Sequence, residues 1–388
     1  MTQVARPRIF WALVTVNVCL LGVAAAGLPA VASAKAAQGG PDQPPQMSDT
    51  YFKNVQVLKG IPVDEFMDVM GMFSSSLGFD CASCHSEELY TDRAAFAITT
   101  PLITRARQML LMMNTINNNF FKGEKRVTCF TCHRVRNQPA SIPSLALQYG
   151  ELLEDPSDIA VIGDSRISAD QVFSKYLQAL GGAQRVAAVT SLVAKGTYEG
   201  FNTGGAPVAI EIFSAAPNKR TQVVQAPDGA GTKTFDGSRG WVAEPWRPIP
   251  LMPLTGGNLT GARLEAFVTF PAGLQKAFTN WQVSSAVIDN KAVQVLQGSN
   301  AGELPVNFYF DASGLLIRTV RWSRTAAGIV PTQVDFSEYR DVSGIKIPFL
   351  MVMTWTDGQN TYRFSEVQAN VAIPATRFAT PAPYAKRG

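Results

Sequence analysis

Two copies of the pattern Cys-x-x-Cys-His constrain this chain more than any other feature. They are Cys81-Ala82-Ser83-Cys84-His85 and Cys129-Phe130-Thr131-Cys132-His133. Together they use four of the five cysteines and both histidines of the chain. In c-type haem attachment the two cysteines form thioethers with the haem and the adjacent histidine binds the iron. The sequence therefore predicts two covalently bound haems c.

The alternative interpretation is a redox-active or zinc-binding cysteine pair that a histidine happens to follow. Such a coincidence would have to occur twice and consume every histidine of the chain. The fifth cysteine, Cys19, lies in an N-terminal apolar stretch, so the body of the protein has none left for a disulfide. We therefore expect haem attachment at Cys81, Cys84, Cys129 and Cys132, and iron ligation by His85 and His133.

The sixth iron ligands cannot be histidines of this chain, because no third histidine exists. Methionine is the common alternative in cytochromes c, and a methionine–histidine pair raises the reduction potential. Three methionines precede each motif: Met67, Met70 and Met72 before the first, and Met109, Met112 and Met113 before the second. Methionines on a helical face are also frequent core residues, so spacing alone leaves the choice open.

The N-terminal 34 residues have the pattern of an export signal. Arg6 and Arg8 form a basic start, residues 9–34 carry no charge, and Ala32-Ser33-Ala34 is a small-residue cleavage pattern. Residues 9–34 are also long enough to span a bilayer, which takes ~20 apolar residues. We expect a periplasmic protein, either cleaved after export or anchored to the cytoplasmic membrane by residues 9–34.

The order helix, stop, haem motif occurs twice. Pro62 suits a first helical turn and Gly78 a helix end, directly before the first motif. Thr100 and Pro101 can begin a second helix that runs towards Phe121 and precedes the second motif. This order predicts an internal repeat with one haem in each copy.

Composition and periodicity divide the rest of the chain. Hydrophobic residues make up 46% and charged residues 16%, which excludes a disordered chain, and the formal charge of +4 without basic runs excludes a nucleic-acid partner. After a helix over 169–180, period-two alternation predicts a β-rich part. Strands are expected at 191–201, 207–214, 219–226, 231–236, 281–288, 291–298, 304–311, 314–323, 330–339, 345–356 and 360–370.

The predicted fold class is multidomain: a mostly α-helical dihaem cytochrome c domain followed by a mainly antiparallel, half-barrel-like β domain. The expected parts are the signal or anchor (1–34), a linker (35–47), the dihaem domain (48–140), a second linker (141–168) and the β-rich domain (169–388).

Four stretches between residues 50 and 138 carry a family resemblance. They are Val57-Leu58-Lys59-Gly60-Ile61-Pro62-Val63, Leu77-Gly78-Phe79-Asp80-Cys81, Ala106-Arg107-Gln108-Met109-Leu110 through Ile116-Asn117, and Val127-Thr128-Cys129-Phe130-Thr131-Cys132-His133-Arg134. They resemble the cytochrome c subunit of photosynthetic reaction centres. In that family a methionine on the preceding helix is the sixth ligand, which the resemblance places at Met70 and Met109, with Met72 and Met112 as runners-up. The well-known members carry four haems and lack the β-rich part.

The segments around the two motifs differ in charge. Residues 61–92 contain seven acids and no Lys or Arg, whereas residues 105–136 contain seven basic residues and the single acid Glu124. Negative surroundings favour ferric iron and lower the potential. Our hypothesis is that the first haem has the lower potential, passes electrons to the second, and docks a basic donor through an acidic surface. Alternatively, the arginines neutralise haem propionates and the acids are a solvated face.

The β-rich part contains neither Cys nor His, which excludes a haem, a zinc site of the usual ligands and a Ser-His-Asp triad there. Two of its segments, Phe235-Asp236-Gly237-Ser238-Arg239-Gly240-Trp241 and Phe310-Asp311-Ala312-Ser313-Gly314-Leu315-Leu316, resemble the half-barrel of periplasmic lipoprotein-carrier proteins. That resemblance implies an apolar concave face for a hydrophobic or lipid ligand. The alternative is a core filled by side chains.

Taken with the resemblance, these features predict a periplasmic carrier of single electrons rather than an enzyme. Its partners would be redox proteins, including a photosynthetic or a respiratory membrane complex. A dihaem peroxidase is the enzymatic alternative, but it needs an open or displaceable sixth iron position, which two axial methionines would fill. A third alternative is a lipid-handling protein with accessory haems.

Overall fold

A computed structural model describes residues 44–139, 141–142, 145, 159–161, 163 and 166–384. The contacts divide the chain after Ala37, and all of the described residues belong to the second unit. The predicted signal or anchor and most of both predicted linkers lie outside the described residues, so the domain boundaries stay a prediction. Within the described part of the chain, no helix is both long enough and apolar enough to cross a membrane.

The segment that carries both motifs contains two long helices. α2 (Val63–Leu77) has 15 residues and α4 (Pro101–Phe120) has 20. The remaining elements are short: α1 (Ser48–Tyr51), α3 (Cys81–Cys84), α5 (Cys129–His133) and the 3₁₀ turns Glu87–Tyr90 and Arg93–Ala97. The predicted mostly α-helical domain is therefore wrong. Only α2 and α4 have apolar periodicity over several turns, and each haem motif lies on a single helical turn joined by irregular chain.

The ends of α2 and α4 follow from their local sequence. Pro62 precedes α2, and Gly78 ends it in the left-handed conformation at φ 70°, which glycine adopts without strain. Thr100 accepts a hydrogen bond from the backbone N–H of Ile103 at the start of α4, and Pro101 occupies the first turn. The predicted starts of both helices and the predicted end of α2 are confirmed.

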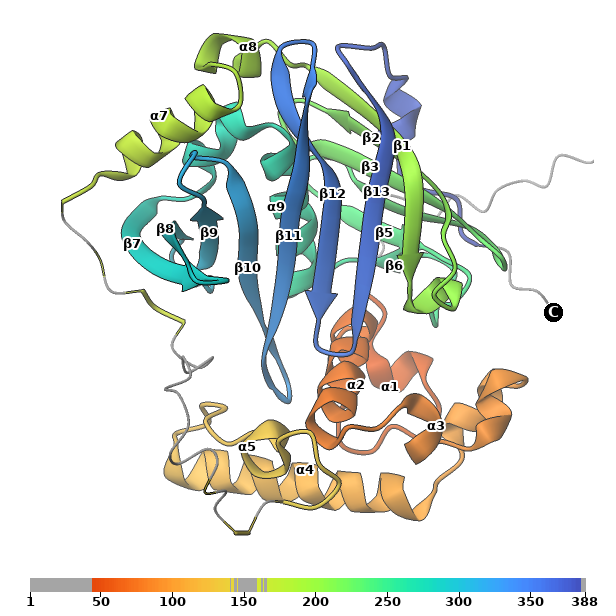
Figure 1. The fold of residues 1–388 in the computed structure, drawn as a ribbon. Helices are drawn as coiled ribbons and strands as arrows, with labels where there is room; N and C mark the ends of the chain where they lie inside the picture. The colour runs from red at the N-terminus through yellow and green to blue at the C-terminus, as the bar shows by residue number, and fades with distance from the viewer. Residues whose placement is uncertain are drawn as a thin grey trace, which may run out of the picture. The chain divides into compact units, whose positions relative to one another are not determined.

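The second part of the chain forms one 13-stranded antiparallel sheet (Figure 1). The strands are β1 (Ser191–Gly200), β2 (Val208–Ala215), β3 (Lys219–Ala226), β4 (Gly229–Phe235), β5 (Gly240–Ala243), β6 (Met252–Pro253), β7 (Asn280–Ile288), β8 (Lys291–Ser299), β9 (Val306–Phe310), β10 (Leu316–Thr325), β11 (Gly328–Val342), β12 (Ile345–Trp355) and β13 (Gly358–Ala369). Their order is β6-β5-β4-β3-β2-β1-β13-β12-β11-β10-β9-β8-β7. The predicted antiparallel β structure is confirmed, and the pairing of β1 with β13 joins its two halves.

The helices of this part are α7 (Ala169–Ala179), α8 (Ala183–Ala187) and α9 (Gly256–Thr269), and 3₁₀ turns lie at Phe201–Thr203, Pro271–Ala277 and Ala375–Phe378. The sequence predicted α7 but not α9. Helix α9 connects β6 to β7 and packs against β3, β4 and β10. The main core joins α7, α9 and the strands around the fully buried Leu274, Leu296 and Phe308.

Acidic residues of helix α2 form hydrogen bonds with the sheet part. Asp64 accepts hydrogen bonds from the backbone N–H and the hydroxyl of Thr255, at 2.6 and 2.7 Å. Asp68 accepts one from Asn258 at 2.9 Å, and Glu65 accepts one from a backbone N–H of the β10–β11 turn at 2.9 Å. Three of the seven acids that we expected on a free docking surface are therefore used inside the protein.

An apolar cluster extends the same contact. Val69 and Met72 of α2 and Leu110 of α4 pack in one cluster with Ala327 and Val330 of the β10–β11 hairpin. Burial of such side chains contributes roughly 1.5–3 kcal/mol each relative to exposure. The segment with the haem motifs and the sheet part therefore share a core.

Candidate haem sites

Both motifs fold into the same capped helical turn. Before α3, Asp80 accepts hydrogen bonds from the backbone N–H of Ser83 at 2.8 Å and from its hydroxyl at 2.6 Å. Before α5, Thr128 and Thr131 form a reciprocal capping box. Because residues three apart lie on one face of a helix, each turn presents its two cysteines on the same side. Attachment of both cysteines to one porphyrin requires this arrangement.

All four motif cysteines are free thiols. Burial raises the pKa of Cys129 to about 11, and it also raises the pKa values of Cys81 and Cys84. Reactive cysteine pairs have lowered pKa values, because the thiolate is the nucleophile and the metal ligand. These thiols are therefore poorly suited to redox exchange or zinc binding, whereas thioether formation leaves no thiolate to stabilise.

The two motif histidines have different surroundings. Nδ1 of His133 lies 3.0 Å from the carbonyl oxygen of Arg136, and when it donates this bond, Nε2 stays free for iron. Nδ1 of His85 is buried and has no hydrogen-bond partner of normal geometry. The backbone of Phe96 lies close enough to raise the pKa of His85, against the larger effect of burial. Burial lowers the pKa of His85, which favours the neutral form that binds metal.

Each motif is held by the helix of the other repeat. The hydroxyl of Thr100, at the start of α4, donates a hydrogen bond to the carbonyl oxygen of Cys84 at 2.6 Å. The backbone N–H of Val135, just after the second motif, donates to the carbonyl oxygen of Ser76 in α2 at 2.9 Å. Hydrogen bonds therefore link the two predicted haem sites directly.

The candidate methionines differ in how deeply they are buried. Met72 and Met113 are core residues, with 6% and 4% of their surface exposed. Met70 and Met109 are only partly buried, on α2 and α4. Met112 is 47% exposed. The burial of Met72 in the core explains its presence without iron ligation. The assignment of Met70 and Met109 as iron ligands stays a prediction, which their partial burial permits.

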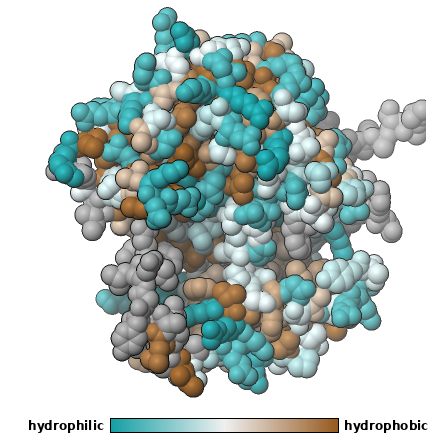
Figure 2. All heavy atoms as spheres, viewed as in Figure 1, coloured by the Kyte–Doolittle hydropathy of each residue, from teal (hydrophilic) through white to brown (hydrophobic). Residues whose placement is uncertain are grey.

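Exposed apolar side chains gather around both motifs. Ten of the fourteen large hydrophobic residues that are exposed in the described part of the chain lie between positions 90 and 135. They are Tyr90, Phe96, Ile98, Leu102, Leu111, Met112, Phe120, Phe121, Phe130 and Val135. Hydrophobic residues also reach the surface around α4 and α5 in Figure 2. Exposed apolar patches often mark binding sites, and a porphyrin is an apolar group that would cover such side chains.

In the described residues, no cluster of three or more His, Cys, Asp or Glu side chains could hold a metal ion by itself. Each motif offers one histidine, so an iron held there would need a porphyrin to supply most of its ligands. The free cysteines, the two histidines and the uncovered apolar surface fit a haem at each motif.

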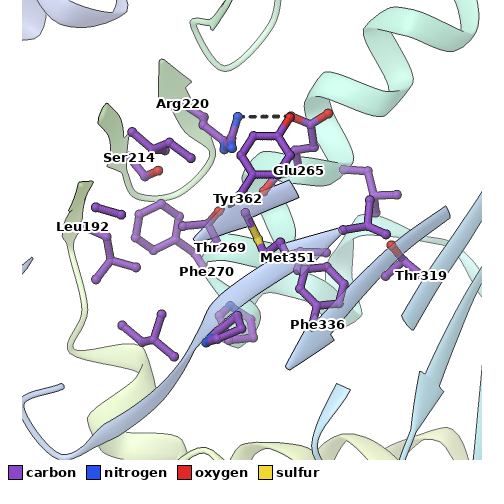
Figure 3. A pocket seen from close by; sticks show the side chains of 18 of the residues that line it. Leu192, Ser214, Arg220, Glu265, Thr269, Phe270, Thr319, Phe336, Met351 and Tyr362 are labelled. Carbon is purple, nitrogen blue, oxygen red and sulfur yellow. Dashed lines mark hydrogen bonds and ion pairs between the residues drawn. The ribbon is translucent and has the colours of Figure 1, made fainter. Parts of the chain in front are cut away.

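A cavity of about 150 Å³ lies between α9 and the sheet. Apolar side chains such as Leu192, Phe336 and Met351 form its wall, and Phe270 follows α9 (Figure 3). At one end Arg220 donates to Glu265 at 3.1 Å, as Figure 3 shows. The expected apolar interior is therefore present, although it is smaller than the 300–1,000 Å³ typical of ligand pockets.

Solved structures similar to this chain cover its second part. A DUF1329 family protein from Desulfovibrio piger is 10% identical, covers 54% of this chain and 96% of its own, and has a TM-score of 0.38. A LolA superfamily protein from Nitrosomonas europaea is 12% identical, with coverages of 55% and 98% and a TM-score of 0.37. A putative outer membrane lipoprotein-sorting protein domain from Vibrio parahaemolyticus is 11% identical, with coverages of 54% and 97% and a TM-score of 0.37.

The resemblance to lipoprotein-carrier proteins is thus found among solved structures, but TM-scores below 0.5 assign no ligand to this chain. Two family models match the chain itself. A family of unknown function, DUF6544, matches residues 254–367. The photosynthetic reaction centre cytochrome c subunit family matches residues 24–150 and confirms the resemblance seen in the motifs. This stretch, with both Cys-x-x-Cys-His motifs, is similar to that subunit and gives the chain a cytochrome-like function.

Proposed function

We propose that this protein is a dihaem cytochrome c that carries single electrons between redox partners. Cys81 and Cys84 would attach the first haem and Cys129 and Cys132 the second. The axial iron ligands would be His85 with Met70 and His133 with Met109. When bound, each haem supplies one reversible ferric–ferrous couple. The chain's own residues attach it, orient the imidazole and exclude water.

The observation that carries this proposal is the shared geometry of the two motifs. Each is a capped turn with free cysteines on one side, a histidine directly after them and uncovered apolar surface nearby. The match to the reaction centre cytochrome family adds support. A peroxidase would need a displaceable sixth ligand, whereas the proposed ligands Met70 and Met109 would fill that position.

Removing one cysteine pair tests haem attachment directly. We expect Cys81→Ala/Cys84→Ala and Cys129→Ala/Cys132→Ala each to lose one of two covalent haems, because the thioethers cannot form. Haem per chain is measured by pyridine haemochrome absorbance after denaturation and by intact mass. Cys19→Ala is the matched control and should keep both haems. Two haems retained in either double variant would overturn the proposal.

The direction of electron flow is a second element of the proposal. The first haem would have the lower potential and reduce the second. Among the basic residues near the second motif, Arg105, Lys122, Arg126, Arg134 and Arg136 are exposed. They provide a positive surface for an acidic partner or for haem propionates.

We also propose that residues 1–34 direct export, so that the cytochrome works in the periplasm, free or anchored by residues 9–34. The electron partner would be a membrane complex of photosynthesis or, alternatively, of respiration.

The cavity of the sheet part supports a second candidate role, the binding of a small apolar group. An engineered cavity of about 150 Å³ lined by aliphatic and aromatic side chains is known to hold benzene. A volume of this size accepts one ring or a short stretch of acyl chain, not several lipid chains. A hydrophobic ligand in this part would therefore be small or only partly enclosed.

Filling the cavity tests that role. Leu264 of α9 lines it and is 7% exposed. We expect Leu264→Trp to weaken binding of a fluorescent fatty acid to the full chain at least about tenfold, since the added ring occupies the space that a ligand would fill. Val287→Trp, at a position 65% exposed on β7, is the control and should bind as wild type does. Equal binding by all three proteins would exclude the cavity.

A further inference from the structure

A carboxylate of the sheet part lies against the helix that leads to the first haem motif. Asp357 occupies the turn between β12 and β13, and its carboxyl packs over Gly71 of α2. A Cβ atom placed on Gly71 would lie 2.8 Å from Oδ1 and 2.9 Å from Cγ of Asp357. The helix can approach this closely only because residue 71 has no side chain. Asp357 is thus fixed beside the residue that follows Met70.

The field of this carboxylate reaches the attachment site. The pKa of the Cys81 thiol is raised by burial first and by the negative charge of Asp357 second, ahead of the charge of Asp80. Neighbouring protein atoms raise the pKa of the Asp357 carboxyl by desolvation, although the residue as a whole is exposed to solvent. The charge of Arg247 and a hydrogen bond with Trp355 act in the opposite direction and favour the carboxylate.

Most acids near the first motif are used elsewhere. Asp64, Glu65 and Asp68 hold α2 against the sheet part. Asp80 is engaged by Ser83 as the cap of α3, and these bonds lower its pKa. Asp357 is the carboxylate that faces the site from the sheet side.

The second motif meets an uncharged part of the same sheet. A Cβ atom on Gly328, at the β10–β11 turn, would lie 2.7 Å from Cγ2 of Thr128, the cap of α5, and 3.5 Å from Cε of Met72. Ala327 beside it is fully buried. The sheet part therefore presents a carboxylate to the first site and small apolar residues to the second.

We propose that Asp357 lowers the reduction potential of the first haem, so that the sheet part helps to set the direction of electron transfer. This inference rests on the proposed haem attachment. A fixed negative charge stabilises ferric iron relative to ferrous iron. The second haem, whose motif lies against Gly328 of the sheet part, keeps its higher potential.

The test is a spectroelectrochemical titration of the full chain carrying both haems. Asp357→Asn removes the charge and keeps the size of the side chain. We expect the reduced-to-oxidised ratio of the first haem, at a fixed applied potential, to rise a few-fold to about tenfold. A tenfold change corresponds to a shift of 59 mV for one electron. The second haem should not shift, and the single-haem cysteine variants assign each wave to its site.

Three further variants separate charge from packing. Asp357→Glu keeps the charge and should leave the potential near its wild-type value, whereas Asp357→Ser is a second neutral change and should raise it as Asn does. Asp341→Asn removes an exposed charge near the last residue of β11, at the end of the sheet away from Asp357, and should leave the potential of the first haem unchanged. Haem content is counted in every variant. This inference alone would be overturned if both neutral variants bind two haems and keep the wild-type potential of the first haem. It would also be overturned if Asp357→Glu shifts that potential as much as the neutral variants do. A wild-type chain without haem would instead overturn the proposed function.

Discussion

Replacing Met109 with histidine is expected to lower the midpoint potential of the second haem by a substantial part of the ~0.8 V range that axial ligands span. The thioether sulfur of methionine favours ferrous iron, so a methionine–histidine pair has a higher potential than two histidines. Met109 lies in the middle of α4 and is only partly buried, so the broader, rigid imidazole ring can be accommodated. Spectroelectrochemical titration gives the potential, and loss of the methionine-type absorption of ferric haem gives the ligand change.

Met112 is the matched control for this experiment. It lies one helical turn further along α4 and is 47% exposed, so Met112→His changes the same residue type with less disturbance of packing. We expect its potentials to equal those of wild type. A fall in potential with Met112→His and none with Met109→His would show that the runner-up methionine is the ligand.

The haem motifs could be predicted from the sequence because their chemistry is local. Covalent attachment requires two cysteines and a histidine within five consecutive residues, and a single helical turn brings them together. The caps that shape these turns, Asp80 and Thr128, were not predicted from the sequence, although Asp and Thr are residue types that favour helix starts. Their hydrogen bonds with Ser83 and Thr131 needed the structure.

Strands were predicted well because their periodicity and turn residues are also local. Asp289-Asn290 and Ser343-Gly344 have positive φ at the expected turns. Helix α9 was missed because Gly256, Gly257 and Gly261 lower its helix propensity and give it a weak apolar face. Tertiary packing stabilises it instead: Gly261 lies against the guanidinium of Arg321, which a side chain at that position would displace.

The helical fraction of the first part was overestimated for a related reason. The repeat of helix, stop and motif is real, but α3 and α5 have four and five residues. Single turns of this length are not stable on their own and depend on capping and on neighbouring elements. The pattern therefore located the helices without revealing how little of the segment they occupy.

Contacts between residues far apart in the sequence could not be predicted at all. The acids of residues 61–92 suggested a docking surface, whereas Asp64 and Asp68 bind Thr255 and Asn258. Nothing in the local sequence of either segment predicts these hydrogen-bonded pairs. The influence of Asp357 on the first haem site belongs to the same class, since it depends on where a distant hairpin packs.

The Asp64–Thr255 contact is expected to have the largest effect on stability. Asp64 is 3% exposed and accepts two short hydrogen bonds from Thr255. Asp64→Ala would leave the Thr255 N–H and hydroxyl buried without their acceptor. We expect the free energy of unfolding to fall by about 2–4 kcal/mol, since each hydrogen bond to a charged group contributes roughly 1.5–3 kcal/mol and such terms are not additive. Urea unfolding followed by tryptophan fluorescence measures it.

Asp49→Ala is the control for Asp64→Ala. It also removes a carboxylate near the start of the described chain, but not the buried contact with Thr255. Asp49 is exposed and accepts one backbone hydrogen bond, from Gly60 at 2.9 Å, so its removal leaves a donor that water can satisfy. We expect a much smaller change than for Asp64→Ala. Because Asp64 joins α2 to the sheet part, its loss should also let the haem absorbance change at lower urea than the tryptophan fluorescence. Coincident transitions with wild-type stability would mean that the shared apolar core alone holds the two parts together.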